Sequence, residues 1–238
     1  MASDRRVTVL IPAAGESSRY REAGYDLPKH MLRITYGGVN RTMLGHVLRC
    51  LPESVDVLVG VKQIFPNHYD VVAADNTMVV KETTGQADTV RQMLSNVNDD
   101  NMVMVMDCDT LVLREDVMQI PLYLETWSAV VLVAENRNDR SMSRVDHIPH
   151  PTVFVEKKDI SQWGMVSVRA FHSAGLLRST LEQVVAEHRE IGTEPYLSHV
   201  LNRYPGTKYA LVTKKYTDWG VPAKLINSGA VIEEEISE

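Results

Sequence analysis

The sequence predicts an α/β protein with a mostly parallel central sheet and helices on both of its faces. Two observations carry that prediction. Short runs of apolar, largely β-branched residues recur along the chain, and continuous runs of this kind are typical of strands buried on both faces. Segments with helical spacing of apolar residues lie between several of these runs. Such alternation requires crossover connections, which favour parallel neighbours in the sheet.

The strands are expected where the apolar runs occur. β-branched residues dominate most of these runs and favour a pleated sheet, while the methionines of the third run are expected to fill gaps in the core. In chain order the expected strands are VTVLI (7–11), VDVLVGV (55–61), MVMVM (102–106), AVVLVA (129–134), TVFVE (152–156), GMVSV (164–168) and YALVT (209–213).

The helices are expected in the segments that separate these strands. In chain order they are MLGHVLRCL (43–51), ADTVRQMLSNV (87–97), REDVMQIPLYLETW (114–127), SAGLLRSTLEQVVAEH (173–188) and PYLSHVLNRY (195–204). In the fourth, apolar residues recur at helical spacing, namely Leu176, Leu177, Leu181, Val184 and Val185. Pro121 has no backbone N–H, so the third is expected to be kinked or split. The polar stretch 136–151 predicts a long loop.

Composition narrows the class of protein. The chain has 238 residues, 44% hydrophobic and 24% charged, which is ordinary for a globular protein with a sizeable core. A net charge of −6 argues against a broad nucleic-acid-binding surface. Cys50 and Cys108 have no metal-binding spacing and are expected to be reduced thiols. No signal peptide and no membrane-spanning run is recognised, so the expected location is the cytoplasm.

The loop that follows the first strand is a candidate phosphate-binding site. The sequence PAAGESSRYREAGYDLPK leaves a buried strand at residue 12, and ligands of α/β sheets bind beyond the carboxyl ends of strands. Backbone amides of Ala13, Ala14 and Gly15 are expected to face an anion, with positive charge from Arg19 and Lys29. The segment is neither a Rossmann fingerprint nor a P-loop. A tight turn with solvated charges is the alternative interpretation.

A second candidate site is the sequence MVMVMDCDTLV (102–112). Asp107 and Asp109 follow a buried strand and, two residues apart, are expected to project from the same face. Two carboxylates repel each other unless a cation joins them, and hard oxygen ligands suit Mg²⁺ or Mn²⁺. The alternative is a helix-capping aspartate next to a turn aspartate.

These motifs resemble, in order, those of the sugar-phosphate nucleotidyltransferases. The G-x-G-[ST]-R loop and Pro-Lys pair of that family correspond to GESSR (15–19) and PK (28–29). The remaining matches are MLGHVL (43–48), GQADT (85–89), the aspartates of DCD (107–109), EK (156–157) and DWGVP (218–222). Three departures stand out: Ser17 replaces the second loop glycine, Val221 replaces a threonine, and Asp107 and Asp109 both fit one family aspartate.

The resemblance implies a nucleotide-diphospho-sugar transferase fold, GT-A-like and Rossmann-like, and a single catalytic domain over residues 1–238. Some relatives continue into a left-handed β-helix beyond that point. The implied reaction joins a nucleoside triphosphate to a sugar-1-phosphate and releases pyrophosphate, with Mg²⁺ (or Mn²⁺) as cofactor. Neither the base, the sugar nor the oligomeric state is specified. Two alternatives remain open: a glycosyltransferase of the same fold, and a non-catalytic protein that binds a nucleotide sugar.

The resemblance also implies roles for single residues. Asp109 (or Asp107) and Asp218 hold the metal, and Arg19 and Lys29 bind the triphosphate. Lys157 binds the sugar phosphate, Glu156 accepts the hydroxyls of the sugar, and Gln86 reads the base. Gly164 is a further substrate contact.

Overall fold

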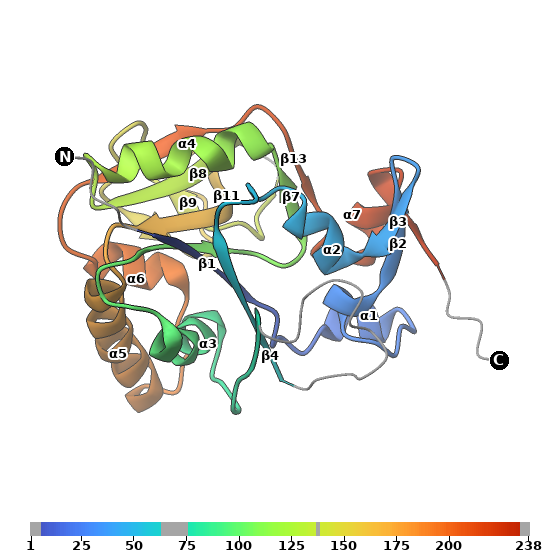
Figure 1. Cartoon of the computed structure of the whole chain (residues 1–238), viewed down its shortest axis with the longest axis horizontal. Coiled ribbons are helices and arrows are strands. Elements are labelled where there is room, and N and C mark those ends of the chain that lie inside the picture. Colours follow the sequence, from blue (N-terminus) through green and yellow to red (C-terminus); the bar gives the residue numbers. More distant parts are fainter. Residues whose placement is uncertain (1–5, 63–75, 137–138, 234–238) are drawn as a thin grey trace.

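The computed structural model describes residues 6–62, 76–136 and 139–233. It confirms the α/β class, with a central sheet between two layers of helices (Figure 1). The strands of the sheet are β1 (Val7–Pro12), β4 (Asp56–Val61), β5 (Thr77–Val79), β6 (Met102–Met106), β8 (Ala129–Glu135), β9 (Arg144–Val145), β10 (Phe154–Val155), β11 (Trp163–Phe171) and β12 (Lys208–Val212).

The sheet is mostly parallel, with one long antiparallel strand. Its order is β10-β9-β11-β6-β1-β4-β5, and β8 pairs with β11 and carries β12 on its other side. The pairs of β1 with β4 and β6, of β4 with β5 and of β8 with β12 are parallel. Strand β11 runs antiparallel to both β6 and β8. The parallel strands β1 and β6 therefore end side by side, at Pro12 and Met106.

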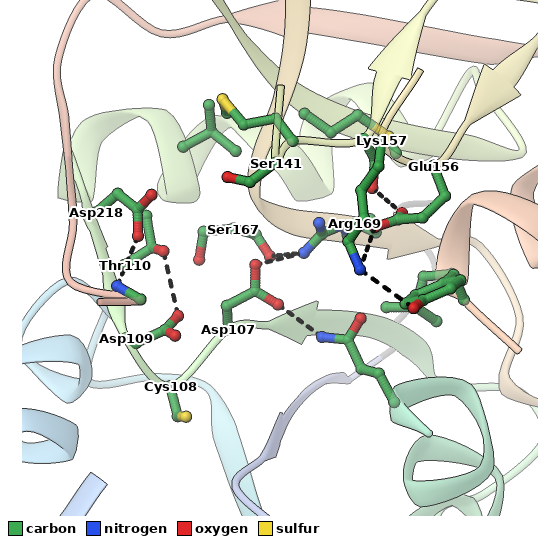
Figure 2. Close-up of a pocket in the computed structure, with 18 of the residues that line it drawn as sticks. Asp107, Cys108, Asp109, Thr110, Ser141, Glu156, Lys157, Ser167, Arg169 and Asp218 are labelled. Carbon is green, nitrogen blue, oxygen red and sulfur yellow. Dashed lines mark hydrogen bonds and ion pairs between the residues drawn. The ribbon is translucent and has the colours of Figure 1, made fainter. Parts of the chain in front are cut away.

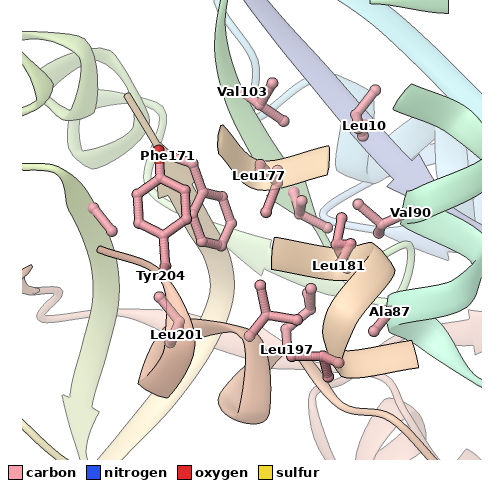
Figure 3. Close-up of a cluster of buried hydrophobic side chains, with 14 of the residues drawn as sticks. Leu10, Ala87, Val90, Val103, Phe171, Leu177, Leu181, Leu197, Leu201 and Tyr204 are labelled. Atoms are coloured by element: carbon pink, nitrogen blue, oxygen red, sulfur yellow. The ribbon is translucent and has the colours of Figure 1, made fainter. Parts of the chain in front are cut away.

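Alternation along the buried strands separates two apolar cores. Leu10 and Val103 face a core that contains residues of α3 (Gln86–Met93), α5 (Ala174–Glu190) and α6 (Leu197–Arg203) (Figure 3). The intervening residues face α2 (Met43–Leu48) and α4 (Arg114–Leu124) on the other side. Each fully buried leucine of these faces stabilises the fold by about 1.5–3 kcal/mol.

Helix α5 follows from its sequence. Four of the five expected apolar residues are buried, namely Leu177, Leu181, Val184 and Val185, whereas Leu176 lies in the first turn and is 48% exposed. The helix begins after Ser173, whose hydroxyl accepts a hydrogen bond from the Leu176 amide at 3.3 Å, and such a cap contributes about 1 kcal/mol.

A small lobe beside the sheet was not predicted from the sequence. It contains α1 (Ser18–Glu22), the short 3₁₀ turn η1 (Lys29–Met31), α7 (Pro222–Asn227) and a sheet of β14 (Val231–Ile232), β2 (Arg33–Tyr36) and β3 (Val39–Thr42). Its core includes the fully buried side chains of Tyr20 and Trp219. The Tyr20 hydroxyl donates to the Trp219 carbonyl at 2.5 Å. This contact joins a segment near the start of the described chain to one near its end.

Several expected boundaries differ in the structure. Helix α4 continues through Pro121 without the expected split, because Val117, Ile120 and Leu124 anchor it on both sides of the missing hydrogen bond. The expected strand 152–156 is reduced to β10, and the expected loop 136–151 contains β9. The expected helix 87–97 ends at Met93 and is followed by the 3₁₀ turn η3 (Leu94–Asn96).

Two further expectations concern the thiols and the membrane. Cys50 and Cys108 are free thiols, as expected. Among the described helices, none has the length and hydropathy of a membrane-spanning segment.

Candidate active site

Two adjoining cavities open where β1 and β6 end, and both are lined by Pro12, Lys29, Gln86 and Cys108. The loop cavity, about 360 Å³, is lined by residues 12–17, His30, Lys62, residues 83–86, Thr89 and Glu194. The aspartate cavity, about 350 Å³, is lined by Asp107, Asp109, Asp218, Glu156, Lys157 and Arg169, among others (Figure 2). The structure thus brings nearly all the predicted site residues to one edge of the sheet. Ala13, Ala14 and Gly15 line the first cavity, and Arg19 lines the second.

The loop after β1 is shaped by Ser17. Its φ of +54° lies in the left-handed region that glycine favours, which explains why the related motif has a glycine at this position. The Ser17 hydroxyl accepts a hydrogen bond from the Lys29 amide at 3.0 Å, and this contact ties the two halves of the motif together. The Ala13 amide is already committed, since it donates to the Gly60 carbonyl at 2.7 Å. Only the amides that follow Ala13 remain to face an anion.

Lys29 and Asp109 form a partly buried ion pair between the two cavities. Burial disfavours the charged form of Lys29, but the Asp109 carboxylate outweighs it and raises the pKa of Lys29 above its ordinary value. Burial likewise opposes ionisation of Asp109, and Lys29 reverses the balance and lowers the pKa of Asp109. Both groups are therefore charged at neutral pH.

Asp109 and Asp218 converge although they are far apart in the sequence. Strand β13 (Tyr216–Asp218) pairs with β7 (Thr110–Val112), and the Trp219 amide donates to the Asp109 carbonyl at 2.8 Å. A Cβ atom added to Gly220 would lie 3.0 Å from Oδ1 of Asp218 and 3.5 Å from Oδ2 of Asp109. The two carboxylates therefore face one small space that is open only because residue 220 is glycine.

This carboxylate pair fits a hard divalent cation. Its donors are oxygens, as Mg²⁺ and Mn²⁺ prefer. Each carboxylate is paired with a lysine, Asp109 with Lys29 and Asp218 with Lys224. Within the described residues no third His, Cys, Asp or Glu joins them in a cluster. A cation here would draw its remaining ligands from water and substrate phosphates, which is common for Mg²⁺.

Asp107, the alternative metal ligand, is held by other partners. Its Oδ1 accepts from Nε2 of Gln86 at 2.7 Å, and its Oδ2 accepts from Nη1 of Arg169 at 2.6 Å (Figure 2). Gln86 begins α3 and lines both cavities, so one of its amide hydrogens is bound to Asp107 at their boundary. The geometry favours Asp109 over Asp107 as the partner of Asp218.

Glu156 and Lys157 lie on the opposite side of the aspartate cavity (Figure 2). Glu156 accepts hydrogen bonds from the hydroxyls of Ser143 and Ser198. Lys157 has a φ of +51°, and its ammonium group lies 3.2 Å from the Tyr196 hydroxyl and 3.9 Å from the Glu156 carboxylate. Gly164 does not line the cavity. It is buried in β11, and the next three residues reach the lining instead.

Sequence reasoning missed two charged residues of this cavity, Arg169 and Lys224. Arg169 had a visible signal, because it is a cation within the apolar run GMVSVRAF. Lys224 had none, since a lysine early in a short helix is common on surfaces.

His30 is a buried, neutral imidazole on the wall of the loop cavity. Its side chain is 4% exposed, and Nε2 is buried with no hydrogen-bond partner. Burial, assisted by the charge of Lys29, lowers the pKa of His30 from 6.5 to about 4. Between these two pH values the unfolded chain binds more protons at this residue than the folded one. The folded state therefore loses stability as pH falls through this window.

We expect His30→Gln to flatten the pH dependence of stability between pH 6.5 and 4, the window set by this shift. The variant should lose at most about 1.4 kcal/mol per pH unit from the slope of the free energy of unfolding against pH. Denaturant unfolding at several pH values measures it, with exposed His147→Gln as the matched control. An unchanged slope in His30→Gln would show that this imidazole is not held neutral by the fold.

Comparison with known proteins identifies the family and the fold of the chain. Residues 9–179 match the MobA-like NTP transferase domain, whereas a search of curated proteins found no match. A nucleoside-diphosphate-sugar pyrophosphorylase from Vibrio cholerae is similar in structure, with a TM-score of 0.70 and 18% identity over 92% of this chain and 98% of that one. An inositol-1-phosphate CTP transferase from T. maritima has a TM-score of 0.70 and 16% identity, covering 94% and 93%. A 2-C-methyl-D-erythritol 4-phosphate cytidylyltransferase from Francisella tularensis has a TM-score of 0.67 and 15% identity, covering 94% and 97%.

The structural likenesses show the fold, and the domain match spans most of the chain. Together they confirm the resemblance carried by the motifs. The chain belongs to the MobA-like NTP transferase family and is a nucleotidyltransferase.

Proposed function

We propose that this chain, as a single catalytic domain, joins a nucleoside triphosphate to a sugar-1-phosphate or a similar phosphorylated small molecule. The products are a nucleotide-linked sugar and pyrophosphate. The observation that carries the proposal is that the two cavities meet at Lys29, which is paired with Asp109, and Asp109 in turn faces Asp218. One cavity suits the triphosphate and the other suits the acceptor. The similar structures carry names of enzymes that act on a sugar nucleotide, an inositol phosphate and an erythritol phosphate, which supports a phosphorylated polyol as acceptor.

In this proposal the loop cavity binds the nucleotide. The amides after Ala13 face the phosphates. Arg19 lines the aspartate cavity rather than the loop cavity. It is exposed and forms no ion pair within the described residues, so its planar guanidinium is available for the β- and γ-phosphates where they extend to that side. Lys29, between the cavities, is placed to neutralise charge as the α-phosphate passes from one partner to the other.

The aspartate cavity binds the acceptor. Lys157 neutralises its phosphate, and Glu156 accepts its hydroxyl groups. The acceptor phosphate is already anionic, so its oxygen attacks the α-phosphorus without a general base. Transfer of this type depends on positioning and charge neutralisation. Asp109 and Asp218 would hold Mg²⁺ (or Mn²⁺), which when bound supplies positive charge shared by the two phosphates.

A matrix of substrates tests the proposal. Each of the four common nucleoside triphosphates is combined with several sugar-1-phosphates, inositol 1-phosphate and phosphocholine in the presence of Mg²⁺, and pyrophosphate is measured. We expect release with a restricted set of pairs and none without an acceptor. In a parallel assay with a nucleotide sugar as the only nucleotide, its consumption without pyrophosphate release would identify a glycosyltransferase. Binding without turnover of any pair would identify a non-catalytic protein.

A further inference from the structure

Arg169 is a buried cation in the aspartate cavity for which the reaction above has no use. It lies in β11 among apolar residues and is only 7% exposed, yet it lines the cavity. The pairing of β11 with β8 shifts register between Met165 and Arg169. Ser167, within that irregularity, has a φ of +52°. The pairing of β11 with β8 is therefore irregular at the point where Ser167 and Arg169 meet the cavity, and such irregularities often redirect side chains.

One edge of the Arg169 guanidinium is committed and the other is free. Nη1 donates to Oδ2 of Asp107 at 2.6 Å and to the Ser167 carbonyl at 2.8 Å. Nε is buried without an acceptor, and no described residue accepts from Nη2. The Ser167 hydroxyl is also buried without a partner. Buried polar groups are nearly always hydrogen-bonded, so unpaired donors beside a cavity indicate a missing acceptor.

The unused atoms have a specific geometry. Nε and Nη2 lie on the same edge of the guanidinium plane and form a fork that matches two oxygens of a phosphate or carboxylate. Figure 2 places Asp107 and Ser167 between the side that carries Asp109 and Asp218 and the side that carries Glu156 and Lys157. An acceptor that spans these two sides would pass this point.

We propose that Arg169 and Ser167 form an oxyanion subsite in the aspartate cavity, where Nε and Nη2 of Arg169 bind two oxygens of one group of the acceptor. This inference rests on the proposed function only in taking this cavity as the acceptor side. The group is either the phosphate of the acceptor or a carboxylate substituent on it, because both offer two oxygens in a plane. Arg169 thereby selects acceptors, while its third nitrogen keeps Asp107 in place.

A purely structural role for Arg169 predicts a different result. Arg169 holds Asp107, and Asp107 holds Gln86 at the boundary with the loop cavity. If Arg169 acted only through this chain of hydrogen bonds, its loss would resemble the loss of Asp107 and would weaken the nucleotide. An oxyanion subsite instead makes the loss of Arg169 weaken the acceptor.

The first test is independent of activity. The Nε–H signals of arginine are followed by NMR in the ¹⁵N-labelled full chain, and Arg169→Lys identifies the Arg169 signal by its disappearance. We expect inorganic phosphate or acetate to shift this signal in a saturable manner, and Ser167→Ala to weaken the binding at least about threefold. A response to phosphate assigns the subsite to the acceptor phosphate, and a response to acetate alone assigns it to a carboxylate. No response to either probe overturns the proposal.

The second test uses the substrate pair found in the matrix. Arg169→Lys keeps the charge and loses the fork, so we expect the KM of the acceptor to rise at least about 10-fold and the KM of the nucleotide to stay within about twofold. Exposed Arg203, whose partner is Glu187, gives the matched control Arg203→Lys.

A nucleotide KM that rises equally in Arg169→Lys and Asp107→Asn would overturn the subsite. If pyrophosphate is released but the Arg169 NMR signal responds to neither phosphate nor acetate, only the subsite is refuted. If the Arg169 signal responds but no substrate pair releases pyrophosphate, only the proposed function is refuted.

Discussion

Replacing either Asp109 or Asp218 by asparagine lowers the rate of pyrophosphate release at least about 100-fold, a loss of ~2.7 kcal/mol of transition-state stabilisation. The reason is the shared space beside Gly220, which both carboxylates face. An amide keeps the shape of each side chain and removes the charge that a divalent cation requires. Initial rates at saturating Mg²⁺ measure the effect, and EDTA should abolish the activity of the unmodified protein.

Gly220→Ala is an independent variant at the same place. It removes no charge, but its Cβ would lie 3.0 Å from the Asp218 carboxylate, which must then shift by a few tenths of an ångström, and 3.5 Å from Oδ2 of Asp109, so that it fills the space between them. We expect a reduced rate and a higher Mg²⁺ requirement. Asp99→Asn is the matched control, because Asp99 pairs with Arg178 and lines neither cavity. Full activity in both Asp109→Asn and Asp218→Asn would refute the metal site. If only Asp107→Asn loses activity, Asp107 rather than Asp109 is the metal ligand.

Gly15→Val should abolish nucleotide binding while the protein stays folded. Gly15 lines the loop cavity, and an added Cβ would meet no heavy atom within 4 Å. Its backbone is outside the left-handed region, so a side chain there causes no strain. The branched side chain would stand where the backbone is proposed to meet phosphate. We expect a loss of at least about 100-fold in affinity, ~2.8 kcal/mol, measured by titration calorimetry with nucleoside triphosphate.

Two further variants serve as controls for the Gly15→Val result. Gly15→Ala adds a single methyl group and should have an intermediate effect. Glu22→Val places the same branched side chain at the end of α1, outside both cavities, and should bind normally. Thermal unfolding confirms that each variant is folded. A folded Gly15→Val protein with unchanged affinity would show that the loop is only a turn.

The class of fold and the location of the site were readable from the sequence for local reasons. A strand buried on both faces needs a continuous apolar run, so β1, β6, β8 and β12 were recognised close to their true bounds. The polar residues that follow β1 and β6 had to leave the sheet at its edge. The resemblance implied that the loop of Gly15 and the pair Asp107 and Asp109 belong to one site, and the parallel direction of β1 and β6 is the physical reason that they meet.

The small lobe was not predicted because its elements are short and each buries little apolar surface by itself. Strands β2, β3 and β14 have no long apolar run, and β14 pairs with β2 from the other end of the chain. Their core depends on Trp219 and Tyr20, which meet only after the chain has folded. Ser17 was visible as a departure from the motif, but its left-handed backbone was not.

The sequence by itself therefore determined the α/β class, the positions of most of the buried strands along the chain and the two strand exits at which charged residues gather, since these depend on local pattern. Only the tertiary structure decided which charges act together. It paired Asp109 with Asp218 beside Gly220, and it turned Asp107 to Gln86 and Arg169. The reason is physical: these contacts depend on strand pairing and side-chain direction between segments far apart in the chain, which no local pattern encodes.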